Sequence, residues 1–169
     1  MFDFKLQRIK NSIRKHFKFL FELGFRFHSA KYQKEHMGYW EVILQSKDLF
    51  VQVYNDRGEI MLSIGHAQSK DDVWYGLSVL VYFITKGEHF IGSYDGDLID
   101  KDKQLQRLSN ILSKYLDDIR GVVEIKYKGN KENLQKTYLE ILDLYRKEYL
   151  KSRPTRELQK YVPKRKDSQ

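Results

Sequence analysis

Hydrophobic positions recur along this chain with two different periods, and each period predicts a different kind of element. Over the first 24 residues, apolar side chains recur at steps of three and four, which indicates an amphipathic helix that ends near Gly24. Because the apolar stripe is wide enough to cover a core, we expect this helix to pack over a sheet and not to lie on a membrane surface. The stripe consists of Phe2, Leu6, Ile9, Ile13, Phe17, Leu20 and Phe21.

Alternating polarity follows and predicts antiparallel strands. The segment 55–58 is typical of a hairpin turn, and we expect Gly58 to take the left-handed position of a type I turn followed by a bulge. The result is a meander of about four antiparallel strands. The first strand is expected to begin with residues 25–29, and the other three are expected at 39–45, 49–54 and 60–65.

Three more helices are predicted after the sheet. The sequence from Ser69 to Asp72 is typical of a helix N-terminus, and residues 73–84 that follow are apolar on nearly all sides. This pattern indicates a central helix buried between the sheet and other helices. Two amphipathic helices are then expected over 105–119, with Asp100 as the N-cap, and over 134–149.

The predicted fold class is therefore α+β, an antiparallel meander of about four strands packed against an N-terminal helix, a buried central helix and two C-terminal helices. We expect residues 1–151 to form one domain and residues 152–169 to form a basic, flexible tail. Residues 122–127 are either a short strand or an extended linker. No apolar run reaches the roughly 18–20 residues of a membrane-spanning helix, so a membrane partner is not expected.

Charge is distributed unevenly. The net charge is +8. Residues 1–38 and residues 145–169 each carry nine basic and three acidic side chains, whereas residues 39–144 carry thirteen basic and seventeen acidic ones. Basic ends can bind nucleic acid, although solvated helix faces and a solubilising tail explain them as well. The nucleic-acid alternative would use Arg153, Arg156, Lys160, Lys164, Arg165 and Lys166.

Catalytic and metal-binding signatures are missing from the sequence. The chain has no cysteine, which excludes disulfides and thiolate chemistry and suits a cytoplasmic protein. Its histidines lack the spacing of a zinc site, and no glycine-rich phosphate loop or nucleophile elbow is present. Alternating aspartates at 95–102 suggest calcium, but they lack the EF-hand order of ligands. We therefore expect a non-enzymatic protein with no catalytic residues, metal or cofactor.

Two loops and one surface are candidates for binding another protein. Charged side chains gather at the predicted hairpin tip, and a second polar loop follows the central helix. An exposed face of the sheet is the third candidate. The ordinary explanation for the tip is that a solvated turn needs Asp and Gly. The candidate residues are Asp56, Arg57, Glu59, Tyr94, Asp95 and Asp97.

Four segments also carry a resemblance to a protein family. They resemble small, mostly uncharacterised bacterial α+β proteins, some of which are immunity proteins of polymorphic toxin systems. The resemblance covers residues 17–120 and implies a non-enzymatic protein that binds and neutralises a partner protein. Inhibitors of basic nuclease toxins tend to be acidic, and only the central region fits that expectation. The segments are LFELGF (20–25), VQVYNDRGEIMLSIG (51–65), WYGLSVLVYFI (74–84) and QLQRLSNILSKYLDDI (104–119).

Overall fold

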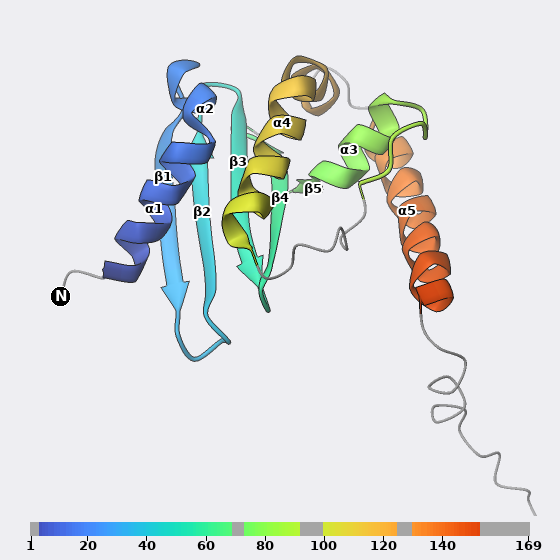
Figure 1. Ribbon diagram of the computed structural model, residues 1–169. Helices are drawn as coiled ribbons and strands as arrows, with labels where there is room; N and C mark the ends of the chain where they lie inside the picture. The colour runs from blue at the N-terminus through green and yellow to red at the C-terminus, as the bar shows by residue number, and fades with distance from the viewer. Residues whose placement is uncertain (1–3, 69–72, 92–99, 125–129, 153–169) are drawn as a thin grey trace, which may run out of the picture.

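The computed structural model describes residues 4–68, 73–91, 100–124 and 130–152, with side chains excepted at position 145 and from position 148 onward. In this part of the chain a five-stranded antiparallel sheet and five helices form, which confirms the α+β class (Figure 1). The elements are α1 (Phe4–His16), α2 (Lys18–Glu22), β1 (Arg26–Gln33), β2 (Tyr39–Gln45), β3 (Leu49–Asp56), β4 (Glu59–His66), β5 (Tyr75–Gly76), α3 (Leu77–Ile84), α4 (Lys101–Val123) and α5 (Asn130–Ser152).

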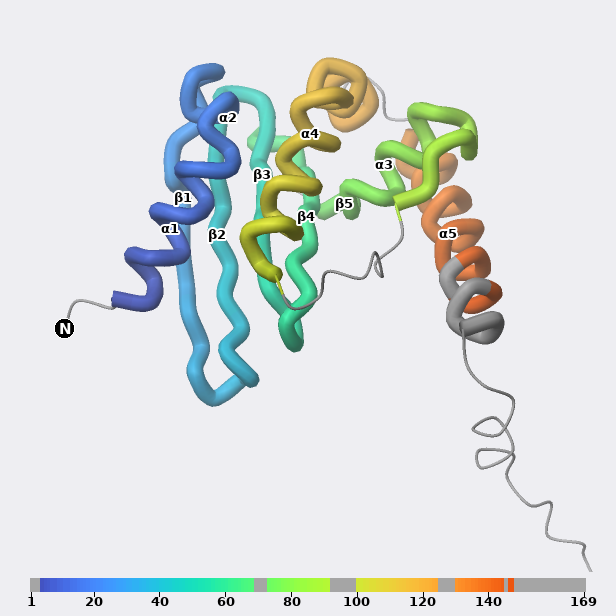
Figure 2. The backbone as a smooth tube through the Cα atoms, viewed as in Figure 1, coloured from blue at the N-terminus to red at the C-terminus, as the bar shows by residue number. Residues whose placement is uncertain are grey.

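The sheet is a meander in which spatial order equals chain order, from β1 to β5. Helices α1, α2 and α4 lie over one face of the sheet, and α3 and α5 lie beyond β5 (Figures 1 and 2). Every second side chain of the central strands points into the core beneath these helices, as the alternation predicts. The buried strand residues include Val42, Leu44, Val51, Val53, Leu62 and Ile64.

The N-terminal amphipathic segment forms two helices where the sequence predicts one. The chain leaves helical geometry at Phe17, with φ −104° and ψ 31°. Ile13, Phe17 and Leu20 are all fully buried, so the break directs side chains from both helices into one core. Gly24, with φ +91°, ends α2 as predicted, and its N–H donates to the carbonyl of Phe21.

The turn between β3 and β4 is tighter than predicted. Asp56 pairs directly with Glu59, and the register runs without a shift, so the loop has two residues and no bulge. Arg57 and Gly58 both have positive φ, at 53° and 93°, as in a type I′ turn. Gly58 is left-handed as expected, but the type I turn with a bulge is wrong because a primed turn matches the twist of the strands better.

The central helix begins later than predicted. Tyr75 and Gly76 form a short strand that pairs with Ile64 and Ser63, and α3 starts only at Leu77. A short apolar run does not distinguish a strand from a buried helix, and here the backbone of β4 recruits the start of the run. The helix is otherwise as buried as expected and packs against both α4 and α5. The helix start predicted at Ser69 lies outside the described residues.

Helix α4 positions the hairpin and the N-terminal helices. Its N-cap is Asp100, as predicted, whose Oδ1 accepts a hydrogen bond from the N–H of Lys103 at 3.1 Å. Asp102 joins α4 to α1, because its carboxylate lies 3.2 Å from Nε2 of His16 and 3.4 Å from Nζ of Lys15. The helix continues to Val123, so residues 122–123 are helical and not a strand or linker.

Candidate partner-binding face

The predicted hairpin tip is described, and α4 fixes it in place. Gln104 accepts a hydrogen bond from the N–H of Ile60 at 2.8 Å and donates one to the carbonyl of Gly58 at 3.3 Å. Strand β5 pairs with residues 63 and 64, and no other described strand lies beside the start of β4 on that side. The Gln104 amide, in a side chain that is only 5% exposed, satisfies these backbone groups in place of a strand and anchors the tip to α4.

Replacing Gln104 with leucine should lower the free energy of unfolding by about 1–3 kcal/mol, because it leaves two backbone groups without their partner. Urea unfolding of the variant measures this loss. The control is Gln135→Leu, a matched change at an exposed position of α5, which should stay within about 0.5 kcal/mol of the parent protein. Equal stability of both variants would show that the Gln104 amide does not hold the tip.

The two carboxylates at the hairpin tip repel each other. Asp56 and Glu59 face each other directly across the hairpin, and like charges in that position are destabilising. The Glu59 carboxyl has a raised pKa because burial disfavours its charged form and Asp56 adds repulsion, which Arg107 only partly offsets. Nε of Arg57 lies 3.9 Å from Oδ1 of Asp56. The tip therefore presents two carboxylates that an additional cation would stabilise.

The other predicted contact residues lie outside the described part of the chain. Those of the second loop are Tyr94, Asp95 and Asp97, and those of the basic tail are Arg153, Arg156, Lys160, Lys164, Arg165 and Lys166.

One face of the sheet carries no helix among the described residues. It is opposite α1, α2 and α4 (Figure 1). Its side chains alternate along β2, β3 and β4 with the buried core residues, and nearly all are half-buried because they pack against one another. We call this surface the open face. It consists of Tyr39, Glu41, Ile43, Phe50, Gln52, Tyr54, Met61 and Ser63.

A hydrogen-bonded carboxylate lies at the centre of the open face. Oε2 of Glu41 accepts hydrogen bonds from the hydroxyl of Tyr39 at 3.0 Å and from Nε2 of Gln52 at 2.6 Å. Oε1 lies 3.0 Å from Nζ of Lys31. The Glu41 side chain is only 12% exposed. Three neighbouring strands thus contribute donors to one carboxylate, and the network links four side chains.

Protonation states in this network follow from its geometry. Burial alone would raise the pKa of the Glu41 carboxyl, but hydrogen bonds from Lys31, Tyr39 and Gln52 outweigh it and hold the pKa below its usual 4.5. Burial and the bond to Glu41 raise the pKa of Tyr39 to about 12. Burial also raises the pKa of Tyr54. At neutral pH the face therefore presents an ionised carboxylate and protonated phenols.

The lowered pKa of Glu41 makes stability depend on pH. A carboxyl that ionises more readily in the folded state stabilises the fold above its unfolded pKa, and this contribution is lost as pH falls through the folded pKa. We expect Glu41→Gln to be less stable than the parent near pH 7 and to lose less stability below about pH 4. Urea unfolding across this range measures both quantities. The exposed control Glu140→Gln should keep the acid loss of the parent, and a Glu41→Gln variant that also keeps it would contradict the assignment.

Aromatic rings line the end of the open face near β5. The ring of Phe50 lies 5.1 Å from that of His28 and 6.0 Å from that of Trp74. Trp74 packs directly over Gly65, where an added Cβ would lie 3.2 Å from the indole. The open face therefore joins an aromatic end to a polar centre, and its other end is the hairpin tip.

The Glu41 carboxylate is poorly suited to act as a general base. A general base needs a pKa near the working pH, whereas the Glu41 carboxyl has a lowered one and already accepts three interactions. Among the described residues no three His, Asp or Glu side chains lie close enough to hold a metal ion. No described helix is both long and apolar enough to cross a membrane.

None of the residues of the Glu41 network was among the binding residues predicted from the sequence. Alternation in 39–45 and 49–54 places Glu41 and Gln52 at outward positions, which is the only signal that the sequence offers. Which outward residues meet depends on strand register, and register is set by pairing between strands. Gln104 was missed for a related reason, because its partners lie 44 and 46 positions away in the chain.

Comparison of the chain with protein-family models, with curated proteins and with solved structures finds no match.

Proposed function

We propose that this protein is a non-enzymatic binding protein that neutralises a partner protein through the open face and the hairpin tip. The observation that supports the proposal most strongly is the Glu41 network. It preorganises a surface that no described helix covers and that consists of aromatic, aliphatic and hydrogen-bonding side chains. Tyr, Trp, Phe and Met are enriched at the centres of protein interfaces. Groups that are already fixed lose little conformational entropy on binding.

The charge of this surface favours a partner with a basic patch. At the tip the carboxylates of Asp56 and Glu59 face each other, and Arg107 only partly offsets the raised pKa that burial and this repulsion give Glu59. Bringing a Lys or Arg of a partner beside Asp56 and Glu59 would relieve their mutual repulsion. An immunity protein for a basic toxin has this charge relation to its target, and the acidic central region of the chain agrees with it.

A binding assay with the proteins encoded by the adjacent genes tests the proposal. Each is mixed with the purified protein, and a stable complex is sought by size-exclusion chromatography and calorimetry. We expect one of them to bind and to lose its toxic activity when bound. If none of the neighbouring products forms a complex, the proposed function is wrong.

Two matched variants then locate the interface. Ile43→Glu places a charge at the centre of the open face, whereas Leu139→Glu makes the same change on α5, where the side chain is already 58% exposed. Loss of a central contact should weaken binding by about 30-fold or more. The Leu139 variant should bind like the parent. Equal effects, with both variants folded by circular dichroism, would place the interface elsewhere.

A charge variant separates binding from folding at the tip. Glu59→Gln removes the repulsion from Asp56, so it should leave the free energy of unfolding unchanged or raise it by about 0.2–1 kcal/mol. The same change should weaken the complex because it removes a carboxylate that faces the partner. A variant that binds at full strength would contradict the role of the tip.

A further inference from the structure

A second charged surface lies on the opposite side of the molecule from the open face. Within residues 4–26 there is a single acidic side chain, Glu22, among seven Lys and Arg side chains. Six of these cations are carried by α1 and α2. We call their surface the N-terminal basic face, and it consists of Lys5, Arg8, Lys10, Arg14, Lys15 and Lys18.

Two of these cations, Arg8 and Arg14, have no acidic partner among the described residues, whereas Lys15 and Lys18 do have one. Lys18 pairs with Glu22 at 3.3 Å and Lys15 pairs with Asp102 at 3.4 Å. No carboxylate among the described residues lies within ion-pair distance of Arg8 or Arg14. Unneutralised cations concentrated on one surface raise the local concentration of anions and favour a polyanionic ligand.

The position of Arg14 is fixed by aromatic rings. Its guanidinium carbon lies 5.7 Å from the ring centre of Phe21 and 5.2 Å from that of Phe27, and these two rings are 5.2 Å apart. Stacking on rings orients the planar guanidinium while its N–H groups stay available to phosphate oxygens. Lys10 lies over Phe27 at 5.3 Å in the same way. The cations are thus held in place by packing that leaves their charge unsatisfied.

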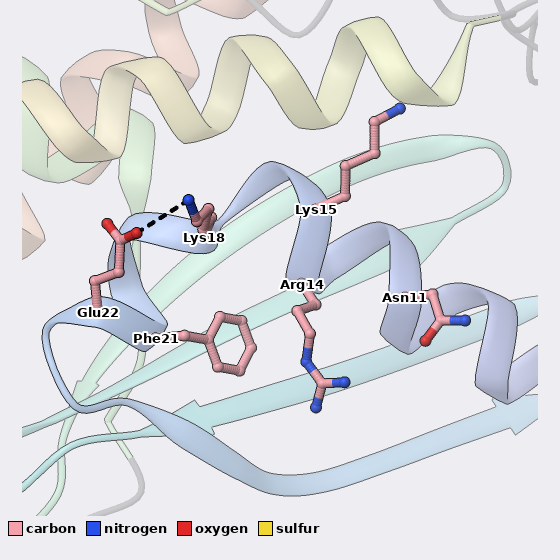
Figure 3. Close-up of a pocket in the computed structure, with 6 residues that line it drawn as sticks. All are labelled: Asn11, Arg14, Lys15, Lys18, Phe21 and Glu22. Carbon is pink, nitrogen blue, oxygen red and sulfur yellow. Dashed lines mark ion pairs between the residues drawn. The ribbon is translucent and has the colours of Figure 1, made fainter.

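An open hollow of about 640 Å³ lies beside Arg14 (Figure 3). Arg14 and Phe21 border it from α1 and α2, and the Lys18–Glu22 ion pair lies at one end of the lining residues. The hollow is wide open to solvent, which suits a chain that runs across the surface more than a small molecule that must be enclosed. Its lining residues are Asn11, Arg14, Lys15, Lys18, Phe21 and Glu22.

Burial of the apolar stripe indicates which of two polyanionic ligands, a lipid bilayer or a nucleic acid, fits this face. A helix that lies on a membrane inserts its apolar face into the lipid. Here Ile13, Phe17 and Leu20 are fully buried in the protein core. Phe4 and Leu23, at opposite ends of the two helices, are the large apolar side chains that this part of the described chain exposes. Among the described residues the face has cations without a continuous apolar surface for insertion into lipid, which favours a nucleic acid over a lipid bilayer.

We propose that the N-terminal basic face binds the phosphodiester backbone of a nucleic acid, independently of the partner that the open face binds. Arg14 lies over both Phe21 and Phe27, and Lys10 also lies over Phe27, so the groups that this face offers to a ligand are mainly cations. Binding therefore runs through phosphates and does not depend on sequence. Each Lys or Arg that contacts a phosphate contributes about one to the slope of log affinity against log salt.

Two variants with equal net charge test this proposal in the full-length protein. The first is Arg8→Gln, Arg14→Gln and Lys18→Gln together. The second is Lys131→Gln, Lys136→Gln and Arg146→Gln on α5, where all three side chains are exposed. Fluorescence anisotropy with a labelled RNA single strand and a labelled DNA duplex, each about 20 nucleotides long, measures affinity between about 50 and 200 mM salt.

The parent protein should bind at least one probe in the micromolar range at low salt. The triple variant of α1 and α2 should bind about tenfold more weakly, and its slope of log affinity against log salt should be smaller by up to about three. The triple variant of α5 should keep the affinity of the parent within about twofold. Arg8→Gln with Lys18→Gln, which retains the packing of Arg14, should show an intermediate loss if the triple variant proves unstable. The proposal is overturned if neither probe binds, if both triple variants lose equally, or if the protein binds phosphatidylserine vesicles but neither probe.

Discussion

Replacing Phe17 with alanine is expected to lower the free energy of unfolding by about 3–5 kcal/mol, as for other buried aromatic residues. Phe17 is fully buried at the break between α1 and α2. Because it stands where the chain changes direction, the surrounding helices cannot close the cavity without moving the junction. A domain with a total stability of about 5–15 kcal/mol would lose a large share of it.

A matched control lies in the same segment. Phe4→Ala makes the same chemical change at a side chain that is 78% exposed, and it should alter stability by no more than about 0.5 kcal/mol. Urea unfolding followed by tryptophan fluorescence compares the two. Similar losses in both variants would mean that the junction is not part of the cooperative core.

Replacing Leu80 with alanine is expected to cost about 2–5 kcal/mol and to loosen α5. Leu80 is fully buried in α3, and α3 packs against both α4 and α5. Truncating it removes contacts at the centre of the helical layer beyond β5. Amide hydrogen exchange in α5 should therefore become faster, in addition to the fall in the free energy of unfolding.

Leu139→Ala is the control for this second variant, since its side chain is 58% exposed on α5. It should leave both the free energy of unfolding and the amide exchange of α5 near the values of the parent. If Leu80→Ala lowers global stability without changing exchange in α5, then α3 does not connect that helix to the rest of the fold.

Most strands, turns and helix ends of this fold were predicted, because each depends on residues that are close together in the sequence. Alternation along 40–45 and 49–54 identified the strands, and Gly24, Gly58 and Asp100 ended or began elements as their backbone chemistry requires. The errors lie where tertiary contacts override local preference. Tyr75 and Gly76 belong to an apolar run that reads as a helix, but the free edge of β4 pairs with them.

The candidate site was predicted only in part, for a physical reason. The hairpin tip follows from turn residues that are adjacent in the chain. The Glu41 network joins Lys31, Tyr39 and Gln52 from neighbouring strands, and only strand register brings them together. A pattern along one chain shows which residues face outward, but it does not show which of them meet.

Oxidative footprinting of the complex tests the central claim most directly. Hydroxyl radicals label exposed aromatic and sulfur-containing side chains, so the free protein should be labelled at Tyr54, Met61 and Trp74 and at the α5 residue Tyr138, which is 48% exposed. In the complex with its partner protein, labelling at the first three should fall sharply while Tyr138 stays as reactive as before. Unchanged labelling of Tyr54, Met61 and Trp74 in a complex that is otherwise stable would contradict the open face as the binding surface.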